Sequence, residues 1–240
     1  MRTSGCAFVD SGKQTPSDLT GSTQDPFAQA RAEMIERQIR RRGVVDPQVL
    51  RAMQEVRRHE FVPPELQARA YEDVPLPIGG GQTISQPYIV AAMTSALYLQ
   101  PSDRLLEVGT GCGYQAAVLA RIVAEVVSIE IRQDLASAAA ARLANLGFSN
   151  VHVHYRDGTL GLPHLAPFNA ILVAAAAPSI PQPLIAQLAE GGRLILPVGP
   201  PDKQQLVRVT RHGSRFDAET LESCQFVPLI GQHGWREPLS

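Results

Sequence analysis

Two spacings of hydrophobic residues alternate along the second half of the chain, one typical of buried strands and one typical of helices. Short apolar runs predict seven strands, at 104–108, 126–130, 151–155, 170–174, 193–199, 205–210 and 223–229. Helical spacing occurs at 115–123, 132–147 and 180–188. The last two strands have no helix between them. These elements predict an α/β fold, a doubly wound and mostly parallel seven-stranded sheet that ends in an antiparallel strand pair.

The first part of the chain has a different pattern and predicts a helical cover for the sheet. One helix begins after Pro26, and Gly43 supplies its stop. Asp46, followed by a proline, opens a second helix as its cap. The residues before Pro26 are rich in Ser, Thr, Gly and Gln, which is typical of disorder. The predicted divisions are a disordered tail at 1–25 and a single domain at 26–240, in which 26–98 form the cover and active-site loop and 99–240 the cofactor-binding sheet with its C-terminal hairpin.

The strand predicted at 104–108 ends in a glycine-rich turn, and a helix follows at once. Gly109, Gly111 and Gly113 occupy alternate positions in this turn. Strand, glycine turn and helix form the arrangement that binds a nucleotide-like cofactor at the carboxyl end of a parallel sheet. Glycine is needed there because a Cβ would block the turn and keep the ligand away from the backbone.

The glycines alone leave two cofactor classes open. Gly111, Gly113 and Ala116 also fit the dinucleotide pattern, whereas a P-loop is excluded because no Lys-Ser/Thr pair follows. Glu107 favours S-adenosylmethionine, because a carboxylate inside a strand end is costly unless it binds something, and this cofactor carries an ammonium and a sulfonium. Glu130 ends the next strand, at a position suited to ribose hydroxyls in either class. The loop therefore favours a methyltransferase over a dehydrogenase.

A second unusual stretch lies at 71–87, where prolines and three consecutive glycines interrupt any regular pattern. A structureless loop of this length inside a compact domain is usually functional. Ser85 and Gln86 end the stretch, directly before a helix that begins at Pro87. Taken by itself, Ser85 is best explained as a capping hydroxyl.

Composition and charge exclude several classes. A formal net charge of −1 over 240 residues argues against a main role in holding nucleic acid. Cys6, Cys112 and Cys224 are scattered, as in proteins of a reducing compartment, and His152 and His154 lack a third ligand, so no metal site is predicted. No stretch has the pattern of a signal peptide or a membrane span. We expect a cytoplasmic protein without membrane or nucleic-acid partners, and we favour a monomer.

Several segments together resemble the protein-L-isoaspartate (D-aspartate) O-methyltransferase family, over roughly 32–231. The segments that carry the resemblance are MIERQIRRRGVVDPQVLRAM, HEFVPPE, AYEDVPLPIGGGQTISQPYIVAAM, LLEVGTGCGYQAAVLA, GGRLILPVG and FVPL. Many methyltransferases share the glycine loop. The segment PLPIGGGQTISQP is specific, because ordinary methyltransferases have nothing similar before the first strand.

The resemblance implies a Rossmann-like repair enzyme that uses S-adenosylmethionine as methyl donor, yields S-adenosylhomocysteine and requires no metal. The implied acceptor is the carboxylate of L-isoaspartyl residues, with D-aspartyl residues as a second class, in damaged proteins and peptides. Ser85 would be the active-site hydroxyl, holding the substrate carboxylate by a hydrogen bond. The implied substrate-binding residues are Thr83, Ile84, Ser85, Gln86 and Tyr88. The implied cofactor-binding residues are Glu107, Gly109, Gly111, Gly113, Glu130, Asp157 and Gly158.

The sequence departs from the family pattern at four positions, Cys112, Asn169, Tyr88 and Ile230. At the last two, some relatives have a histidine and a hydroxyl residue. Two alternatives stay open beside the repair methyltransferase. One is another S-adenosylmethionine-dependent methyltransferase that acts on a small molecule. The other is an NAD(P)-dependent oxidoreductase, although that activity would need neither Glu107 nor the loop before Ser85.

Overall fold

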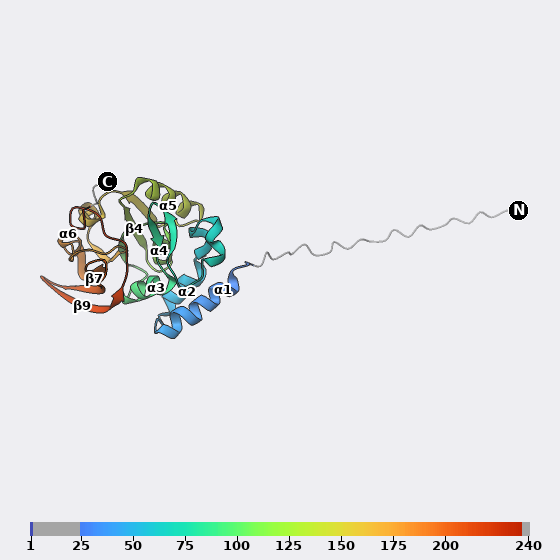
Figure 1. Ribbon diagram of the computed structural model, residues 1–240, viewed down its shortest axis with the longest axis horizontal. Coiled ribbons are helices and arrows are strands. Elements are labelled where there is room, and N and C mark those ends of the chain that lie inside the picture. The colour runs from blue at the N-terminus through green and yellow to red at the C-terminus, as the bar shows by residue number, and fades with distance from the viewer. Residues whose placement is uncertain (2–24, 237–240) are drawn as a thin grey trace.

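The computed structural model describes Met1 and residues 25–236, so the predicted tail lies almost wholly outside the described residues. A central sheet is flanked by helices, with α1 and β9 on opposite sides of the view in Figure 1. Among the described residues, no helix has the length and apolar character needed to cross a membrane.

Seven strands form the central sheet, in the order β5-β4-β3-β6-β7-β8-β9. The first five in this order run parallel, and β8 and β9 are added antiparallel at the edge. This arrangement confirms the predicted fold class. The strands are β3 (Arg104–Val108), β4 (Glu125–Glu130), β5 (Val151–Tyr155), β6 (Phe168–Val173), β7 (Leu188–Val198), β8 (Gln204–His212) and β9 (Arg215–Cys224).

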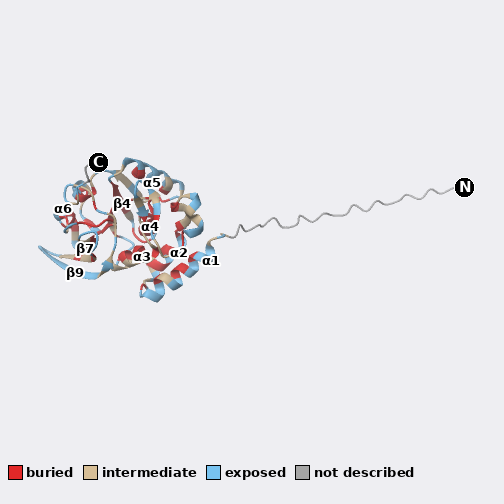
Figure 2. Ribbon diagram, in the orientation of Figure 1, coloured by how far each residue is buried: buried red, intermediate tan, exposed pale blue. Residues whose placement is uncertain are grey.

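Both faces of the sheet are buried, as a parallel sheet requires. In β3, Leu105 belongs to one hydrophobic cluster and Leu106 to the other, because successive side chains point to opposite faces. The buried residues in Figure 2 accordingly gather along the central strands, whereas β9 is exposed over nearly its whole length. The centre of the sheet is therefore a rigid base for the loops at its carboxyl edge.

The predicted helical cover is present. The first helix runs from α1 (Ala28–Glu33) through a π-helical stretch (Met34–Ile39) and a 3-10 turn (Arg40–Arg42), and ends at Gly43 with φ of 96°. The side chain of Asp46 accepts the N–H of Gln48 (2.9 Å) at the start of α2 (Pro47–Glu55). The remaining helices of this part are two 3-10 helices, η3 (Arg58–Phe61) and η4 (Pro64–Arg69), and α3 (Pro87–Ala96).

A buried arginine ties the cover to the cofactor side of the sheet. Arg58 is fully buried, and its Nε donates to the carbonyl of Ala70 (2.7 Å). Its guanidinium carbon lies 4.9 Å from the centre of the Tyr114 ring, at the start of α4 (Tyr114–Ala120). The other helices beside the sheet are α5 (Gln133–Asn145), η5 (Gly158–Leu160), η6 (Pro163–Leu165) and α6 (Gln182–Ile185).

The stretch at 71–87 is not structureless, contrary to the sequence-based prediction. It contains an antiparallel hairpin of β1 (Leu76–Gly79) and β2 (Gln82–Ile84). Three successive glycines at the tip have positive φ values of 94°, 59° and 72°. These φ values produce the tight turn. They also explain why glycine occupies all three positions, because other residues are disfavoured in this conformation.

Three further boundaries differ from the prediction. The last strand is β9 rather than 223–229, because β9 is exposed over nearly its whole length and has no buried apolar run to mark it in the sequence. The helix predicted at 180–188 is only α6, since Leu188 already pairs with Phe168 in the sheet. Strand β7 therefore begins before Gly191 and Gly192, which were expected to precede it. The pairing of β6 with β7 shifts in register between Phe168 and Ala170, and this shift accommodates the residues between Leu188 and Arg193.

Candidate active site

The glycine loop joins β3 to α4 at the carboxyl edge of the parallel strands. Gly109, Gly111 and Gly113 have φ of 94°, 54° and 90°, in the left-handed region where a side chain is disfavoured. The backbone N–H groups of Gly109 and Thr110 both donate to the carbonyl of Ile129, at 2.8 and 3.2 Å. These bonds fix the loop against the end of β4.

A cavity opens in front of this loop, and we name it the glycine-loop cavity. Its walls combine apolar side chains with the backbone of the loop, and among the described lining residues Glu130 is the only acid. The lining includes Val90 and Met93 from α3, Ile129, Glu130 and Ile131 at the end of β4, and Gly158. Such a cavity suits a ligand with a flat apolar part and a few hydroxyl groups.

Glu130 is held on both sides by backbone groups. Its Oε2 accepts the N–H of Gly111 (2.8 Å), and its Oε1 accepts the N–H of Arg132 (3.0 Å). A carboxylate has about four lone-pair sites, so each oxygen can still accept a further hydrogen bond. Glu130 is therefore a preorganised acceptor for two neighbouring hydroxyls.

Glu107 lies in the interior and is not among the residues that line the cavity. The hydroxyl of Ser128 donates to its Oε2, whereas its Oε1 has no hydrogen-bond partner among the described residues. Burial raises the pKa of Glu107 to about 8, and the nearby charge of Glu130 acts in the same direction. The predicted contact between Glu107 and a cofactor stays a prediction.

Asp157 and Gly158 follow β5 and have different roles in the fold. A Cβ on Gly158 would lie 2.4 Å from Val108 Cγ1, so a side chain at this part of the cavity wall would force Val108 to shift. Asp157 does not line the cavity. Its Oδ1 accepts the Thr159 N–H (2.8 Å) and hydroxyl (2.7 Å), and its Oδ2 accepts the Gln232 N–H (2.8 Å). Asp157 thus anchors the C-terminal segment, and its predicted cofactor role stays a prediction.

Gly113 also lies outside the cavity lining, because it faces α5. A Cβ there would lie 3.1 Å from Leu143 Cδ1. The third glycine of the loop therefore permits close packing between the loop and a helix, as in other glycine loops of this type.

The hairpin packs onto the glycine loop and covers the cavity. A Cβ on Gly111 would lie 3.3 Å from Ile78 Cδ1, and one on Gly80 would lie 3.1 Å from Arg132 Nε. Thr83 and Ile84 of β2 line the cavity directly, as does Arg132. Sequence reasoning missed the contacts of Ile78 and Arg132, which only the folded hairpin creates.

Ser85 follows β2 at once and lines two hollows. One is the glycine-loop cavity, and the other is a groove that we name the Tyr88 groove. The cap residue of α3 is Gln86, and no side chain donates or accepts a hydrogen bond there, so Ser85 is not the cap of this helix. The two hollows share a wall made of Thr83, Ser85, Ala174, Phe226 and Val227.

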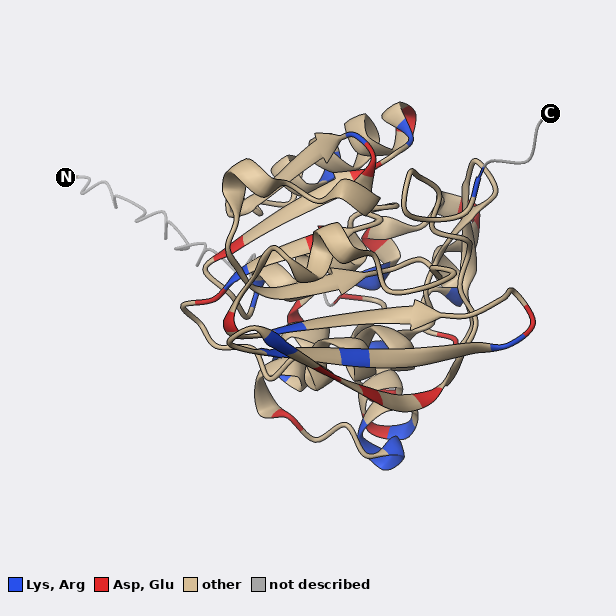
Figure 3. Ribbon diagram, turned by 90° about the vertical axis from the view of Figure 1, so that its left-hand side faces the viewer, with Lys and Arg blue, Asp and Glu red and all other residues tan. Residues whose placement is uncertain are grey.

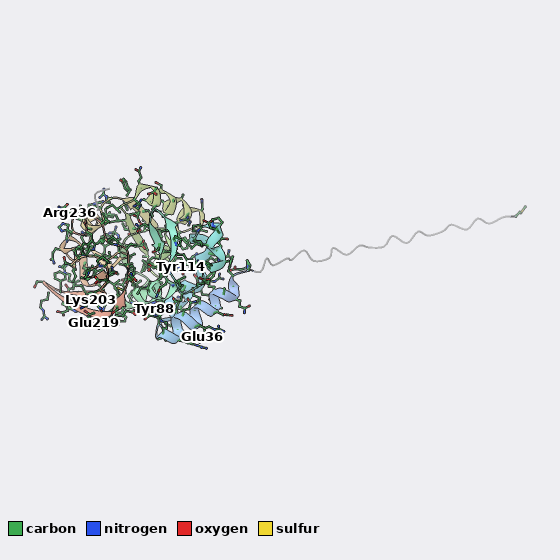
Figure 4. The ribbon with its side chains drawn as sticks, viewed as in Figure 1. Glu36, Tyr88, Tyr114, Lys203, Glu219 and Arg236 are labelled. Atoms are coloured by element: carbon green, nitrogen blue, oxygen red, sulfur yellow. The ribbon has the colours of Figure 1, made fainter. Side chains whose placement is uncertain are left out.

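The Tyr88 groove lies between the cover and the sheet edge. Gln86 and Tyr88 line it, as predicted substrate-binding residues, together with Arg42, Ile89 and Glu222. Figure 4 places Tyr88 between Glu36 of the cover and Glu219 of β9. All five predicted substrate-binding residues therefore line one hollow or both, and their contact with a substrate stays a prediction.

The segment after β9 closes the other side of the cavity. The N–H of Ala176 donates to the carbonyl of Val227, and the N–H of Leu229 donates to the carbonyl of Ala176, both at 2.8 Å. Trp235 Nε1 donates to the same carbonyl (2.9 Å). The cavity residues of this segment are Phe226, Val227, Pro228, Leu229 and Ile230. Only the FVPL motif pointed to them in the sequence.

Three of the four departures from the family pattern line a hollow, Tyr88 in the groove and two others in the cavity. Cys112 and Ile230 line the glycine-loop cavity, and burial raises the pKa of the Cys112 thiol. Asn169 is remote from both hollows, and its Oδ1 accepts the N–H of Arg104 (2.9 Å). Its amide therefore supports the start of β3 rather than the site.

Charges of both signs are interspersed over the face in Figure 3. In the part of the chain that the structure describes, no group of three His, Cys, Asp or Glu residues is placed to hold a metal ion. His152 lies 3.8 Å from Glu125, near the start of β4 and away from the cavity.

Comparisons with known proteins agree on one family. The family model described as "Protein-L-isoaspartate(D-aspartate) O-methyltransferase (PCMT)" matches residues 29–234. A protein-L-isoaspartate O-methyltransferase of Methanoculleus marisnigri is 53% identical over 216 residues, which cover 90% of this chain and 98% of the relative. The enzyme of the same name from Roseiflexus castenholzii is 55% identical over 209 residues, covering 87% and 95%.

Solved structures give the same result. A protein-L-isoaspartate O-methyltransferase superposes with a TM-score of 0.76 at 28% identity, covering 85% of this chain and 67% of that one. A Plasmodium falciparum structure of this enzyme type, in complex with S-adenosyl-L-homocysteine, has a TM-score of 0.73 at 26% identity and covers 84% and 98%. The chain belongs to the protein-L-isoaspartate(D-aspartate) O-methyltransferase family.

Proposed function

We propose that this chain transfers the methyl group of S-adenosylmethionine to the carboxylate of L-isoaspartyl residues, and of D-aspartyl residues as a second class, in damaged proteins and peptides. The observation that carries the proposal is the position of Ser85. It stands in the wall shared by the glycine-loop cavity and the Tyr88 groove. A hydroxyl in that wall can contact molecules on both sides.

The residues of the glycine-loop cavity fit S-adenosylmethionine. Glu130 offers a fixed carboxylate for the two ribose hydroxyls, and Ile129 and Ile131 provide apolar surface for the adenine. Gly158 lets the segment after β5 pack closely against Val108 in the cavity wall. When bound, the cofactor supplies an electrophilic methyl group on a sulfonium.

The chain's own contribution to the reaction is orientation. A carboxylate has a reference pKa near 4, so the acceptor is already ionised at neutral pH and needs no strong base. Ser85 would donate a hydrogen bond to one carboxylate oxygen and direct the other toward the cavity. Positioning of two reactants can lower a barrier by about 7–11 kcal/mol in favourable cases. The hairpin above the cavity and the 226–230 segment beside it would exclude water.

The direct test is methyl transfer to an isoaspartyl peptide with its normal aspartyl twin as the control. We expect labelled methyl ester, lost on mild base treatment, with the isoaspartyl peptide only. Equal labelling of both peptides would contradict the proposed acceptor. Absence of label with either peptide, in a protein that binds S-adenosylhomocysteine, would contradict the proposed activity.

A further inference from the structure

The outer end of the Tyr88 groove contains a linked set of side chains from three distant parts of the chain. Arg42 ends the first helix of the cover, Tyr88 lies in the first turn of α3, and Glu222 lies on β9. The guanidinium carbon of Arg42 is 3.3 Å from the centre of the Tyr88 ring. The Tyr88 hydroxyl donates to the carboxylate of Glu222, at 3.2 and 3.3 Å from its two oxygens.

The positive charge of Arg42 is already balanced. Its Nη1 donates to Asp73 Oδ2 at 2.9 Å, so an ion pair lies beneath the stacked aromatic ring. The stacking occupies one face of the guanidinium, and the ion pair uses one of its N–H groups. Asp73 therefore offsets the positive charge that Arg42 brings to the groove.

The negative charge of Glu222 has no such partner. Its only hydrogen bond among the described residues comes from the neutral Tyr88 phenol, and no lysine or arginine forms an ion pair with it there. Burial, followed by the charge of Glu222, raises the pKa of Tyr88, so the phenol keeps its proton and remains a donor. Apart from Arg42, Glu222 is the only described ionised residue that lines the groove.

We propose that Glu222 is a specificity-determining residue, which favours acceptor peptides with a lysine or arginine close to the isoaspartyl residue. The inference rests on the proposed function, because it assigns the Tyr88 groove to the peptide. Tyr88 keeps the carboxylate in place, and the unused lone pairs of Glu222 face a cationic side chain of the peptide. The net charge of Arg42, Asp73 and Glu222 is −1, which also disfavours an acidic neighbour.

The test compares single-residue variants of one isoaspartyl peptide, with Lys, Ala or Glu at each position flanking the isoaspartyl residue. We expect kcat/KM for the Lys peptide to exceed that for the Glu peptide about fivefold at one flanking position or more, as a half-exposed charge pair allows. Glu222→Gln keeps an oxygen for the Tyr88 hydroxyl and should abolish this preference. Raising the salt concentration should weaken it in the wild type.

Glu219→Gln is the matched control. Glu219 lies on the same strand but pairs with Arg208 and does not line the groove, so this variant should keep the preference. Peptide binding in the presence of S-adenosylhomocysteine, measured by calorimetry, should follow the same order without turnover. A wild type that methylates all the isoaspartyl peptides equally, or a preference that survives Glu222→Gln, would overturn the role of Glu222. A wild type that methylates none of them would instead overturn the proposed function, and the inference with it.

Discussion

The glycine-loop cavity and the Tyr88 groove share five lining residues, yet different parts of the molecule build them. The cavity is centred on the glycine loop at the ends of central parallel strands, with Glu130 fixed by two N–H groups. The groove is formed by side chains of the cover, α3 and the exposed edge strand β9. One hollow rests on the core of the sheet and the other joins peripheral elements.

This difference suggests a division of tasks. A cofactor has the same structure in every reaction cycle, so a rigid backbone frame can serve it. Peptide acceptors vary in sequence, and side chains such as Tyr88 and Glu222 can differ between relatives without disturbing the sheet. Variants on the two sides should therefore affect different measured quantities.

The largest expected effect concerns Glu107, which is buried in β3 and does not line the cavity. Between pH 4.5 and 8 the folded protein keeps a proton on Glu107 that the unfolded chain has released, because the pKa is raised from 4.5 to about 8. The free energy of unfolding must then fall as pH rises through this window, by at most about 5 kcal/mol. Glu107→Gln cannot ionise and should lack this fall.

Urea denaturation of the ligand-free protein at pH 5 and pH 8 measures this effect. The variant should gain stability relative to the wild type at pH 8. A difference between the two proteins that stays constant with pH would show that Glu107 does not titrate in the folded state.

The next effect tests the shared wall. Ser85→Ala should lower kcat about 100-fold, a loss of the size seen when one positioned donor is removed from a reacting group. The dissociation constant for S-adenosylhomocysteine, measured by calorimetry, should change by less than about twofold, since binding energy on the cofactor side comes from elsewhere. Ser85→Thr keeps the hydroxyl and serves as the control. Equal losses in kcat and cofactor affinity would contradict the proposed separation between substrate positioning and cofactor binding.

A smaller effect is expected on the cofactor side. Glu130→Ala removes the proposed acceptor for the ribose and releases the N–H of Gly111. Loss of charge-assisted hydrogen bonds should weaken cofactor binding about 10- to 100-fold. Glu130→Gln should fall between this variant and the wild type. The KM for the isoaspartyl peptide at saturating cofactor should barely change, and a parallel rise would mean that the two hollows are coupled.

The smallest effect concerns the anchor of the C-terminal segment. Asp157→Ala removes the cap of η5 and the bond to Gln232, and should cost about 1–2 kcal/mol of stability. Thermal unfolding measures this loss. Asp202→Ala, at an exposed turn, should stay within about 0.5 kcal/mol of the wild type. Equal losses in the two variants would argue against an anchoring role.

The same contrast explains what the sequence could predict. The strands, the glycine loop and Glu130 follow from local patterns, because hydrophobic runs and glycines mark them directly. The hairpin at 76–84 was missed because its prolines and glycines have the composition of a loop. The groove could not be predicted, since Tyr88 and Glu222 are 134 residues apart and β9 has no buried face.

Trp235 gives the molecule a built-in optical reporter. It is the only tryptophan in the chain, and its indole is bound to the carbonyl of Ala176, beside the segment that closes the cavity. The hairpin lies on the opposite wall and contains no tryptophan. Emission from this single fluorophore therefore follows the C-terminal wall alone, and ligand-induced changes there can be followed without adding a dye.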